Sequence, residues 1–332
     1  MMIKKILFSA ALATSSFCMQ NELVQIVQEY RFNGLESIQK KLDKILTQES
    51  YWLEVLQGQD TDFGYYEDLS FLFVSDKSNL SLWLYKLENG RLTQVSQVNS
   101  IVGVGAGAKK IEGDKITPLG VYTFVDKFQK LDPYYGPMAF ATNYPNLYDK
   151  VLKRTGFGIW IHGMPLNNDR KDKNTKGCIA VENDVITEFD KVIDYKKTLL
   201  ISYEDAMPKV EKADLALILA TLYQWKDAWV RNDINQYLGF YASDFRRHDR
   251  AGLKKFSEYK TRVFAKKETK NIDFSQINIT PYPNAEGKQL FRVSFMQKYT
   301  AYKNKTITYN SRDPKEIYFE IKDGKALILI EK

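Results

Sequence analysis

Two histidines and two cysteines are present in this chain, and one of each lies in a short, glycine-flanked segment. His162 is followed by Gly163, and Cys178 is preceded by Gly177, sixteen residues after the histidine. A cysteine reacts as its thiolate, and a neighbouring imidazole can both accept the thiol proton and stabilise the resulting anion. The spacing therefore predicts a cysteine nucleophile, Cys178, with His162 as its base.

Each of these residues also has an ordinary explanation. Cys178 could be an inert thiol in the core, and His162 could simply end a strand. The flanking glycines favour the reactive interpretation, because Gly177 permits an unusual turn that would free backbone N–H groups to face an oxyanion. A metal centre is disfavoured, since two ligands are too few. We expect no metal and no other cofactor.

The surrounding pattern predicts short strands and loops that would position the pair. The apolar segment 157–161 predicts a strand ending at His162, and the polar segment 167–176 predicts an exposed loop. A second strand over 179–181 and a short helix over 185–193 follow. Upstream, the expected elements are strands 71–74, 80–87 and 121–125, a turn at 75–79, a glycine-rich segment at 102–107 and a loop at 113–120.

Two separated motifs resemble one known family, the L,D-transpeptidase catalytic domain of the YkuD type. The first motif is His162-Gly163, a variable loop, and then a Ser/Thr-x-Gly-Cys sequence that is present here as residues 175–178. The second is a Gly-Asp-x-x-Thr-Pro-x-Gly loop, present here as residues 113–120. The resemblance covers about residues 68–203. It implies that Cys178 forms a thioester with a peptide carbonyl on the L-centre side of a D-residue bond. It also implies that His162 acts as base and then acid, oriented by the main-chain carbonyl of Gly163.

The sequence departs from the family pattern on both sides of the cysteine. Lys176 stands where many members have His or Arg, and Ala180 stands where many have Arg or Asn. Positively charged side chains in the loop could bind the carboxylates of the substrate, although Asp169 and Asp172 make a merely solvated loop a strong alternative. The candidate substrate-binding residues are Trp160, Arg170, Thr175, Lys176 and Gly177.

The N-terminal segment has the layout of a secretory signal peptide. Lys4 and Lys5 precede an apolar run over 6–13, and small residues follow. We expect residues 1–18 to be a signal peptide, with cleavage after Ser15 or Cys18, and a periplasmic mature protein without a transmembrane segment. The net charge of +7 is modest and spread along the chain, which does not suggest a nucleic-acid partner.

Two further units flank the predicted catalytic domain of residues 67–205. Residues 19–66 form a helical unit whose apolar stripe must pack on the next domain or on a second copy, which leaves a homodimer open. Residues 206–332 predict helices followed by an antiparallel sheet, with a hairpin at Asp323-Gly324. This unit looks like a nuclear-transport-factor-like cone, which implies an unknown small ligand. Its Trp225/Trp229 stripe is more readily explained as core, and His248 as part of a solvated basic turn.

The predicted fold class is α+β, with a mainly-β catalytic domain between a helical N-terminal unit and an α+β cone. This layout resembles the periplasmic murein L,D-carboxypeptidases of helical bacteria. The resemblance implies trimming of peptidoglycan stem tripeptides to dipeptides, with an effect on wall structure and cell shape. Attack on the thioester by an amine instead of water would make the protein an L,D-transpeptidase that cross-links stems. A non-catalytic wall-binding scaffold is the third hypothesis, and the intact residues around Cys178 argue against it.

Overall fold

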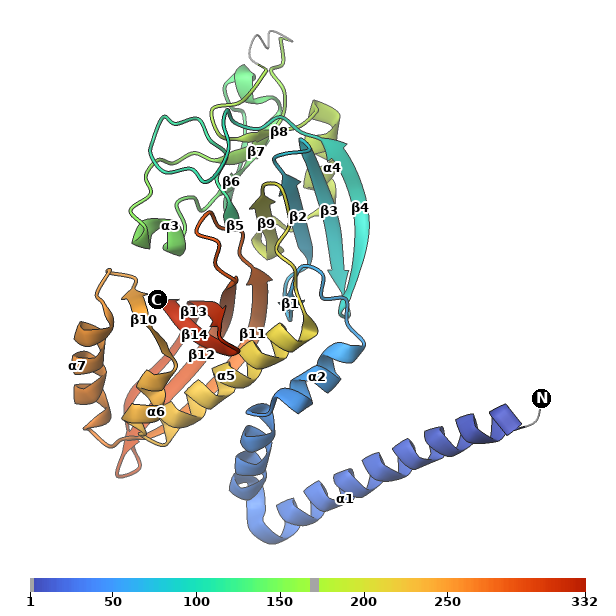
Figure 1. Cartoon of the computed structure of the whole chain (residues 1–332), viewed down its shortest axis with the longest axis vertical. Coiled ribbons are helices and arrows are strands. Elements are labelled where there is room, and N and C mark those ends of the chain that lie inside the picture. The colour runs from blue at the N-terminus through green and yellow to red at the C-terminus, as the bar shows by residue number, and fades with distance from the viewer. Residues whose placement is uncertain (1–2, 168–172) are drawn as a thin grey trace.

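A computed structural model describes residues 3–167 and 173–332, with side chains from residue 23 onward. Two sheets lie one above the other, and the N-terminal helices lie at the far end of the lower one (Figure 1). The helices are α1 (Ile3–Leu46), α2 (Glu49–Gln57), α3 (Leu147–Val151), α4 (Asn183–Val192), α5 (Lys212–Val230), α6 (Ile234–Gly239) and α7 (Leu253–Phe264), with short 3-10 turns η1 (Pro133–Tyr135) and η2 (Tyr195–Lys197).

The upper sheet has eight strands and forms the middle part of the chain. Its order is β4-β3-β2-β9-β5-β6-β7-β8. Most neighbours are antiparallel, but β2 pairs with β9, and β7 with β8, in parallel. The strands are β2 (Phe71–Asp76), β3 (Ser81–Glu88), β4 (Arg91–Asn99), β5 (Gly120–Gln129), β6 (Met138–Thr142), β7 (Trp160–His162), β8 (Ile179–Ala180) and β9 (Thr198–Tyr203).

The lower sheet has six strands and belongs mainly to the C-terminal part. Its order is β1-β11-β12-β13-β14-β10, so that the short β1 adds an edge strand from the N-terminal half of the chain. The strands are β1 (Tyr65–Tyr66), β10 (Tyr241–Arg247), β11 (Thr269–Pro281), β12 (Leu290–Lys303), β13 (Thr306–Lys322) and β14 (Lys325–Glu331).

The central strand β2 shows why the two sheets pack together. Successive side chains of a strand point to opposite faces. Phe71 and Phe73 enter the core of the upper domain, whereas Leu72 and Val74 enter a second cluster shared with the C-terminal domain. β9 behaves in the same way, with Leu200 in the first cluster and its neighbours in the second. Both faces of the sheet are therefore buried, which explains the continuous apolar run in β2.

The shared cluster is a seam between the two domains. From the C-terminal side it includes Tyr282, Tyr318 and Leu329. Polar contacts cross it as well: the side-chain amide of Asn146 donates to the Tyr282 hydroxyl at 2.8 Å. Each large apolar side chain that is buried there stabilises the folded protein by roughly 1.5–3 kcal/mol, compared with the same side chain exposed to water. The seam therefore joins the domains through a buried core as well as through the linker.

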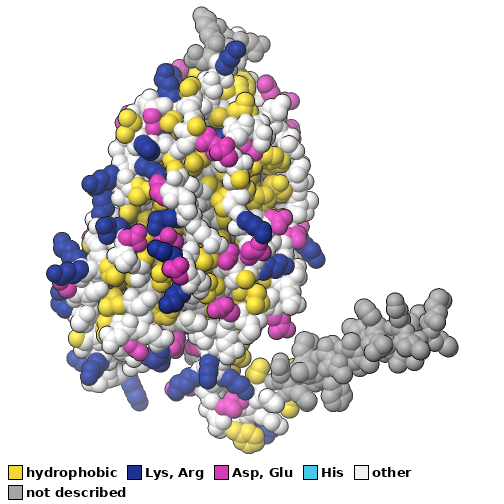
Figure 2. Space-filling model, viewed as in Figure 1, with side chains coloured by type: hydrophobic (Ala, Val, Ile, Leu, Met, Phe, Trp, Pro, Cys, Tyr) yellow, Lys and Arg dark blue, Asp and Glu magenta, His cyan; other side chains and the backbone are white. Residues whose placement is uncertain are grey.

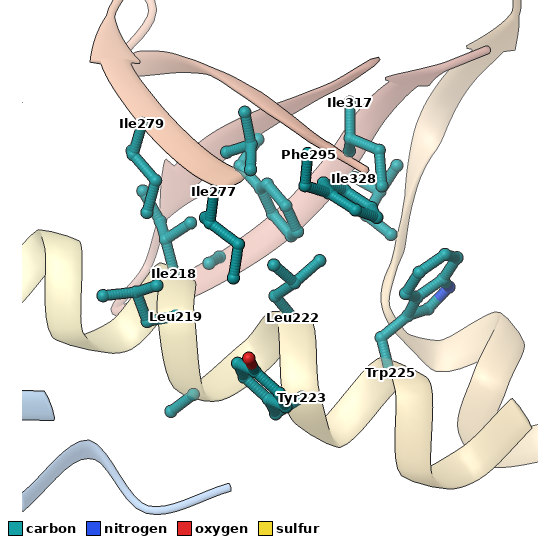
Figure 3. Close-up of a cluster of buried hydrophobic side chains, with 14 of the residues drawn as sticks. Ile218, Leu219, Leu222, Tyr223, Trp225, Ile277, Ile279, Phe295, Ile317 and Ile328 are labelled. Carbon is teal, nitrogen blue, oxygen red and sulfur yellow. The ribbon is translucent and has the colours of Figure 1, made fainter. Parts of the chain in front are cut away.

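The C-terminal domain has its own core between α5 and the lower sheet. Figure 3 shows Ile218, Leu222 and Trp225 of α5 pointing toward Phe295 and Ile328 of the sheet. The three- and four-residue spacing on α5 predicts this face, and the structure confirms the core interpretation of the aromatic stripe. The predicted hairpin at 323–324 is also confirmed, between β13 and β14.

The described side chains of the N-terminal helices pack mainly on α5 of the C-terminal domain. Trp52 of α2 stacks on Tyr223 of α5 with ring centroids 5.5 Å apart, and Lys226 pairs with Asp43 at 2.8 Å. α1 bends at Gly34, whose φ of 80° is outside the helical range. Among the described residues, no helix combines the length and apolar character needed to cross a bilayer.

The α+β class and the three-part layout are confirmed, with differences in detail. The predicted strands over 71–74, 80–87 and 121–125 are present, as is the helix over 185–193 within slightly different bounds. The predicted strand over 157–161 is shorter and begins at Trp160. The sequence analysis missed β4 and β11, and it also missed α7.

Candidate active site

The register of β7 and β8 brings His162 and Cys178 to one face of the upper sheet. Ile161 pairs with Ile179 and His162 pairs with Ala180. Both isoleucines are buried in the domain core, so residues one position away on each strand face the opposite side. His162 lies on that side, and Cys178, two residues before Ala180, follows the same alternation. Small Ala139 and Ala180 lie opposite His162 on the two neighbouring strands.

The His162 ring is held by a short hydrogen bond to the next residue. Its Nδ1 lies 2.6 Å from the carbonyl oxygen of Gly163, and the side chain is only 1% exposed. A carbonyl oxygen can only accept, so Nδ1 carries the proton and Nε2 presents its lone pair. The imidazole is therefore fixed in the tautomer that a general base requires. The contact with Gly163 is the one that the family resemblance implies.

Cys178 lies in a tight turn closed by two threonine hydroxyls. Thr175 Oγ1 donates to the Cys178 carbonyl at 2.6 Å and accepts the Gly177 N–H at 3.1 Å. Thr117 Oγ1 is 3.5 Å from the same carbonyl. The thiol itself is 8% exposed and donates to the carbonyl of Gly158 at 3.3 Å. These contacts fix the backbone that carries the sulfur.

Gly177 was expected to permit an unusual turn, and the structure confirms this: its φ is 120°, and a Cβ would lie 3.0 Å from the Ile116 carbonyl oxygen. The N–H of Gly177 itself is directed to Thr175. That other backbone N–H groups of the turn face an oxyanion stays a prediction. Thr175 uses its hydroxyl inside the turn and is buried, which makes it a structural part of the site.

The glycine-rich segment 102–107 packs directly against this turn. A Cβ on Gly103 would lie 2.1 Å from the Lys115 carbonyl oxygen and 3.0 Å from the Cα of Gly177. The glycines of this segment allow either a close backbone approach or tight bends, and at Gly103 the structure shows the close approach. The far end of the segment is held by Lys77, whose buried ammonium donates to the Gly107 carbonyl at 2.8 Å and pairs with Glu204 at 3.3 Å. Burial lowers the pKa of Lys77, and Glu204 opposes that shift.

The motif loop at 113–120 is organised around Asp114. Its carboxylate accepts hydrogen bonds from the backbone N–H groups of residues 110, 111 and 116 and forms an ion pair with Lys109. Burial raises the pKa of Asp114, but the Lys109 and backbone hydrogen bonds outweigh it and lower the pKa overall. This agrees with a turn-forming role. Across the described residues, no group of three or more metal-ligating side chains is present.

The remaining candidate residues occupy different positions. Trp160 is half-buried on the same face as His162, with its ring 5.0 Å from that of Tyr135. Lys176 is exposed beside the turn, and Arg170 lies outside the described residues. His248 is exposed in a turn where Arg247 and Asp249 form an ion pair, in agreement with a solvated turn. Figure 2 shows basic and acidic side chains interspersed over the visible face, which fits the modest net charge.

Two residues near the site were missed by the sequence analysis. Tyr135 lies with its ring edge-on to His162, at a centroid distance of 5.2 Å. The Asn183 side-chain oxygen lies 2.3 Å from where a Cβ on Gly163 would be, so a side chain there would have to displace its neighbours. The segment Asp132-Pro133-Tyr134-Tyr135-Gly136-Pro137 carries strong turn signals, so the turn could have been predicted but not its contact with His162.

Comparison with known proteins agrees with this geometry. Residues 70–201 match the family model of the YkuD L,D-transpeptidase catalytic domain, and residues 217–332 match that of the Cds6 C-terminal NTF2-like domain. The chain belongs to the peptidoglycan-acting L,D-transpeptidase family, in the group in which a YkuD-type domain precedes an NTF2-like domain. No curated protein sequence matched the chain.

The structural relatives define the group more closely. The helical cell shape determining protein Pgp2 from Campylobacter jejuni is 40% identical, with 86% of this chain and 99% of Pgp2 covered at a TM-score of 0.80. A single-residue mutant of Pgp2 gives 39% identity, coverages of 87% and 99%, and a TM-score of 0.81. Bd1075 from Bdellovibrio bacteriovorus shares the fold at 24% identity, with coverages of 82% and 96% and a TM-score of 0.62.

Proposed function

We propose that this protein is a cysteine-dependent L,D-carboxypeptidase that trims the stem peptides of peptidoglycan. The observation that carries the proposal is the hydrogen bond from His162 Nδ1 to the Gly163 carbonyl, which leaves Nε2 as a base on the face shared with Cys178. The similarity to Pgp2 over almost its whole length supports a role in cell shape. The N-terminal sequence pattern supports export to the periplasm.

The proposed reaction proceeds through a thioester. Nε2 of His162 accepts the Cys178 thiol proton, and the thiolate attacks the carbonyl carbon of the terminal peptide bond. The tetrahedral intermediate expels the terminal amine, which takes the proton from the imidazolium. Water, deprotonated by the same imidazole, then attacks the thioester and releases the shortened stem and the thiol. No other group has to accept or supply a proton.

The acyl acceptor separates this function from its main alternative. If an amine from a second stem attacks the thioester, the product is a cross-link and the protein is an L,D-transpeptidase. The N-terminal helices pack on α5 at the far end of the molecule from the candidate site (Figure 1), so they leave the choice of acyl acceptor to residues of the upper domain. Exposed Lys176 beside the turn supports binding of a terminal carboxylate, as a carboxypeptidase needs.

The test is a digestion of purified muropeptides by the full chain, with products weighed by mass spectrometry. The expected substrate is the stem tripeptide, which would yield the dipeptide. Tetrapeptide stems are offered in parallel, because an L,D-specific enzyme needs a D-residue after an L-centre at the terminal bond. Shortened stems that stay separate support the carboxypeptidase. Joined stems, in which the donor stem has lost its terminal residue, identify a transpeptidase.

Variants of the two histidines provide a matched comparison. His162→Ala should reduce the rate by ~10²–10⁴-fold, the usual effect of removing a positioned base. His248→Ala should leave it unchanged, since His248 is exposed in the C-terminal domain. If folded wild-type protein neither changes muropeptides nor is labelled at Cys178 by a carbapenem-type acylating probe, the non-catalytic scaffold is the better explanation.

A homodimer through the N-terminal helices is a further part of the proposal. α1 and α2 enclose a groove of about 900 Å³ whose lining includes Ile26, Ile38 and Leu42. Several large apolar side chains on α1 are exposed, among them Val27 and Leu35. Light scattering of the full chain and of Leu42→Glu tests this, with a dimer expected only for the wild type.

A small ligand in the C-terminal cone also remains a proposal. Lys260 is buried, with its ammonium 4.6 Å from the centre of the Trp229 ring, and the Trp229 indole N–H is buried without a hydrogen-bond partner. Buried donors of this kind favour an anionic ligand. Equilibrium dialysis of the full chain with radiolabelled muropeptides, in competition with acetate, would test it.

A further inference from the structure

The loop that connects β5 to β6 contributes a residue that the family signature does not contain. This loop holds the turn η1, where the Asp132 carboxylate accepts the Tyr134 N–H at 2.9 Å. The turn ends at Gly136, whose φ is 72°. A Cβ on Gly136 would lie 2.8 Å from the Cα of Gly163, so the loop backbone packs directly on the glycine that follows the candidate base. Tyr135 is thereby placed beside His162.

The main chain of Tyr135 fixes the residue that orients the imidazole. Its carbonyl accepts the Gly163 N–H at 3.1 Å, and the Met138 carbonyl is a second, longer acceptor at 3.4 Å. The Gly163 carbonyl in turn accepts the proton on His162 Nδ1. Because the N–H and the carbonyl belong to one residue, the contact with Tyr135 limits how far the hydrogen-bond acceptor of the imidazole can move.

The side chain of Tyr135 restricts the imidazole from another direction. The two rings are nearly perpendicular, at 87°, with centroids 5.2 Å apart. The same tyrosine ring lies 5.0 Å from Trp160, which is two residues before His162 and on the same face of β7. Edge-to-face aromatic contacts of this kind contribute about 0.5–1.5 kcal/mol beyond the buried area. The tyrosine ring therefore packs against one side of the imidazole.

The Tyr135 hydroxyl is also within electrostatic range of the sulfur. Burial raises the pKa of Tyr135, and the neighbouring Cys178 raises it further. The hydroxyl is therefore neutral at physiological pH and adds no negative charge that would oppose a thiolate. Tyr135 thus contacts the base and its orienting residue without disfavouring the ionised thiol.

We propose that Tyr135 is a positioning residue that holds the His162 imidazole in the orientation needed to ionise Cys178. The inference rests on the proposed function, because it assumes that His162 is the base. It explains why a residue outside both sequence motifs is packed between Trp160 and His162. Its carbonyl and its ring carry the role; the hydroxyl does not.

The test measures alkylation of Cys178 by iodoacetamide as a function of pH, in the full chain and without peptidoglycan. Tyr135→Leu should slow alkylation about 10-fold at pH 7 and move the midpoint toward about 8.5, because an unactivated thiol is only a few per cent thiolate at pH 7. Tyr135→Leu and Tyr135→Phe both keep the main-chain carbonyl, so they test the ring. Tyr135→Phe also keeps the ring and should stay within about 3-fold of the wild type. Near-UV circular dichroism establishes that each variant is folded.

Tyr134→Leu is the matched control. Tyr134 lies in the same turn, and its ring contacts Tyr135 at 5.2 Å. If Tyr134→Leu slows alkylation as much as Tyr135→Leu, the effect is loop packing and the proposal is wrong. An equal loss in Tyr135→Phe would instead assign the role to the hydroxyl and also overturn it. If His162→Ala shifts the pH profile of Cys178 alkylation and Tyr135→Leu leaves it unchanged, the positioning role of Tyr135 is wrong but the proposed function is not. A wild-type thiol no more reactive than a free one would overturn both this role and the proposed function.

Discussion

Replacement of Arg154 by methionine tests whether the seam holds the two domains together. The Arg154 guanidinium donates to Asp149 at 3.0 Å and to Glu286 of the C-terminal domain at 2.8 Å. The side chains of Arg154 and Asp149 are 5% and 0% exposed. Loss of one partner of a buried ion pair leaves an uncompensated charge and costs about 3–5 kcal/mol. We expect Arg154→Met to lower the free energy of unfolding in urea by that amount.

The pH dependence of this loss follows from Asp149. Burial raises the pKa of Asp149 to about 6, and Arg154 opposes the rise. A carboxyl whose folded pKa exceeds its unfolded value of about 3.9 stabilises the fold most below pH 4, and that contribution is lost as the pH rises through 6. Without Arg154 the pKa rises further, so the variant should be more destabilised at pH 7.5 than at pH 5. Each additional unit in the pKa of Asp149 adds about 1.4 kcal/mol to the difference between the destabilisation at pH 7.5 and that at pH 5.

Two further variants make this prediction specific. Arg91→Met removes an exposed ion pair with Asp60, at 3.5 Å, and should cost less than about 1 kcal/mol. Arg154→Met combined with Asp149→Asn removes both buried charges and should recover part of the loss. A loss below about 1 kcal/mol in Arg154→Met at both pH values would refute the reasoning, as would equal effects of Arg154→Met and Arg91→Met.

Three other substitutions have expected outcomes. Thr175→Val removes both hydrogen bonds that close the cysteine turn and should cost about 2 kcal/mol in urea unfolding while slowing Cys178 alkylation. Gly163→Ala places a Cβ 2.3 Å from a side-chain oxygen and should cost about 1–3 kcal/mol, whereas Gly239→Ala, with nothing within 4 Å, should not destabilise. Burial lowers the pKa of Lys260 to about 8, so wild-type stability should rise between pH 8 and 10 as the unfolded chain retains the extra proton. Lys260→Met should remove that slope and raise stability at pH 7 by about 1–3 kcal/mol, measured by urea unfolding at both pH values.

The sequence predicted the elements of the candidate site where its residues lie in contiguous motifs. The His-Gly and Thr-x-Gly-Cys segments indicated a strand that ends at His162 and a second strand that begins directly after Cys178, and both strands are present. Gly103 was also interpretable, because a glycine in a strand-like segment indicates close backbone approach. Contacts between distant segments were not accessible in this way. The approach of Tyr135 to His162 depends on the register of β6 against β7, which no local pattern specifies.

The fold as a whole was also predicted where the pattern is local and missed where it depends on contacts between distant segments. β2 is apolar at consecutive positions, which predicts burial on both faces, but the sequence does not say that the C-terminal domain covers the second face. β13 was only partly predicted, since its first half, from Thr306, is largely exposed and polar and lacks an alternating pattern. The N-terminal stripe predicted packing only in part: Ile38 is buried, whereas Leu35 and Leu42 are exposed. Its partner α5, more than 150 residues away in the chain, was not predicted.

The seam between the two domains also stabilises the sheet that carries the candidate site. His162 and Cys178 lie on short strands at one edge of the upper sheet, and the central strands of that sheet depend on the C-terminal domain for burial of Leu72, Val74 and Val121. Removal of residues 206–332 would expose these side chains at roughly 1.5–3 kcal/mol each, a large share of the 5–15 kcal/mol by which domains are usually stable. The C-terminal domain therefore supports the strands that position the candidate nucleophile and base.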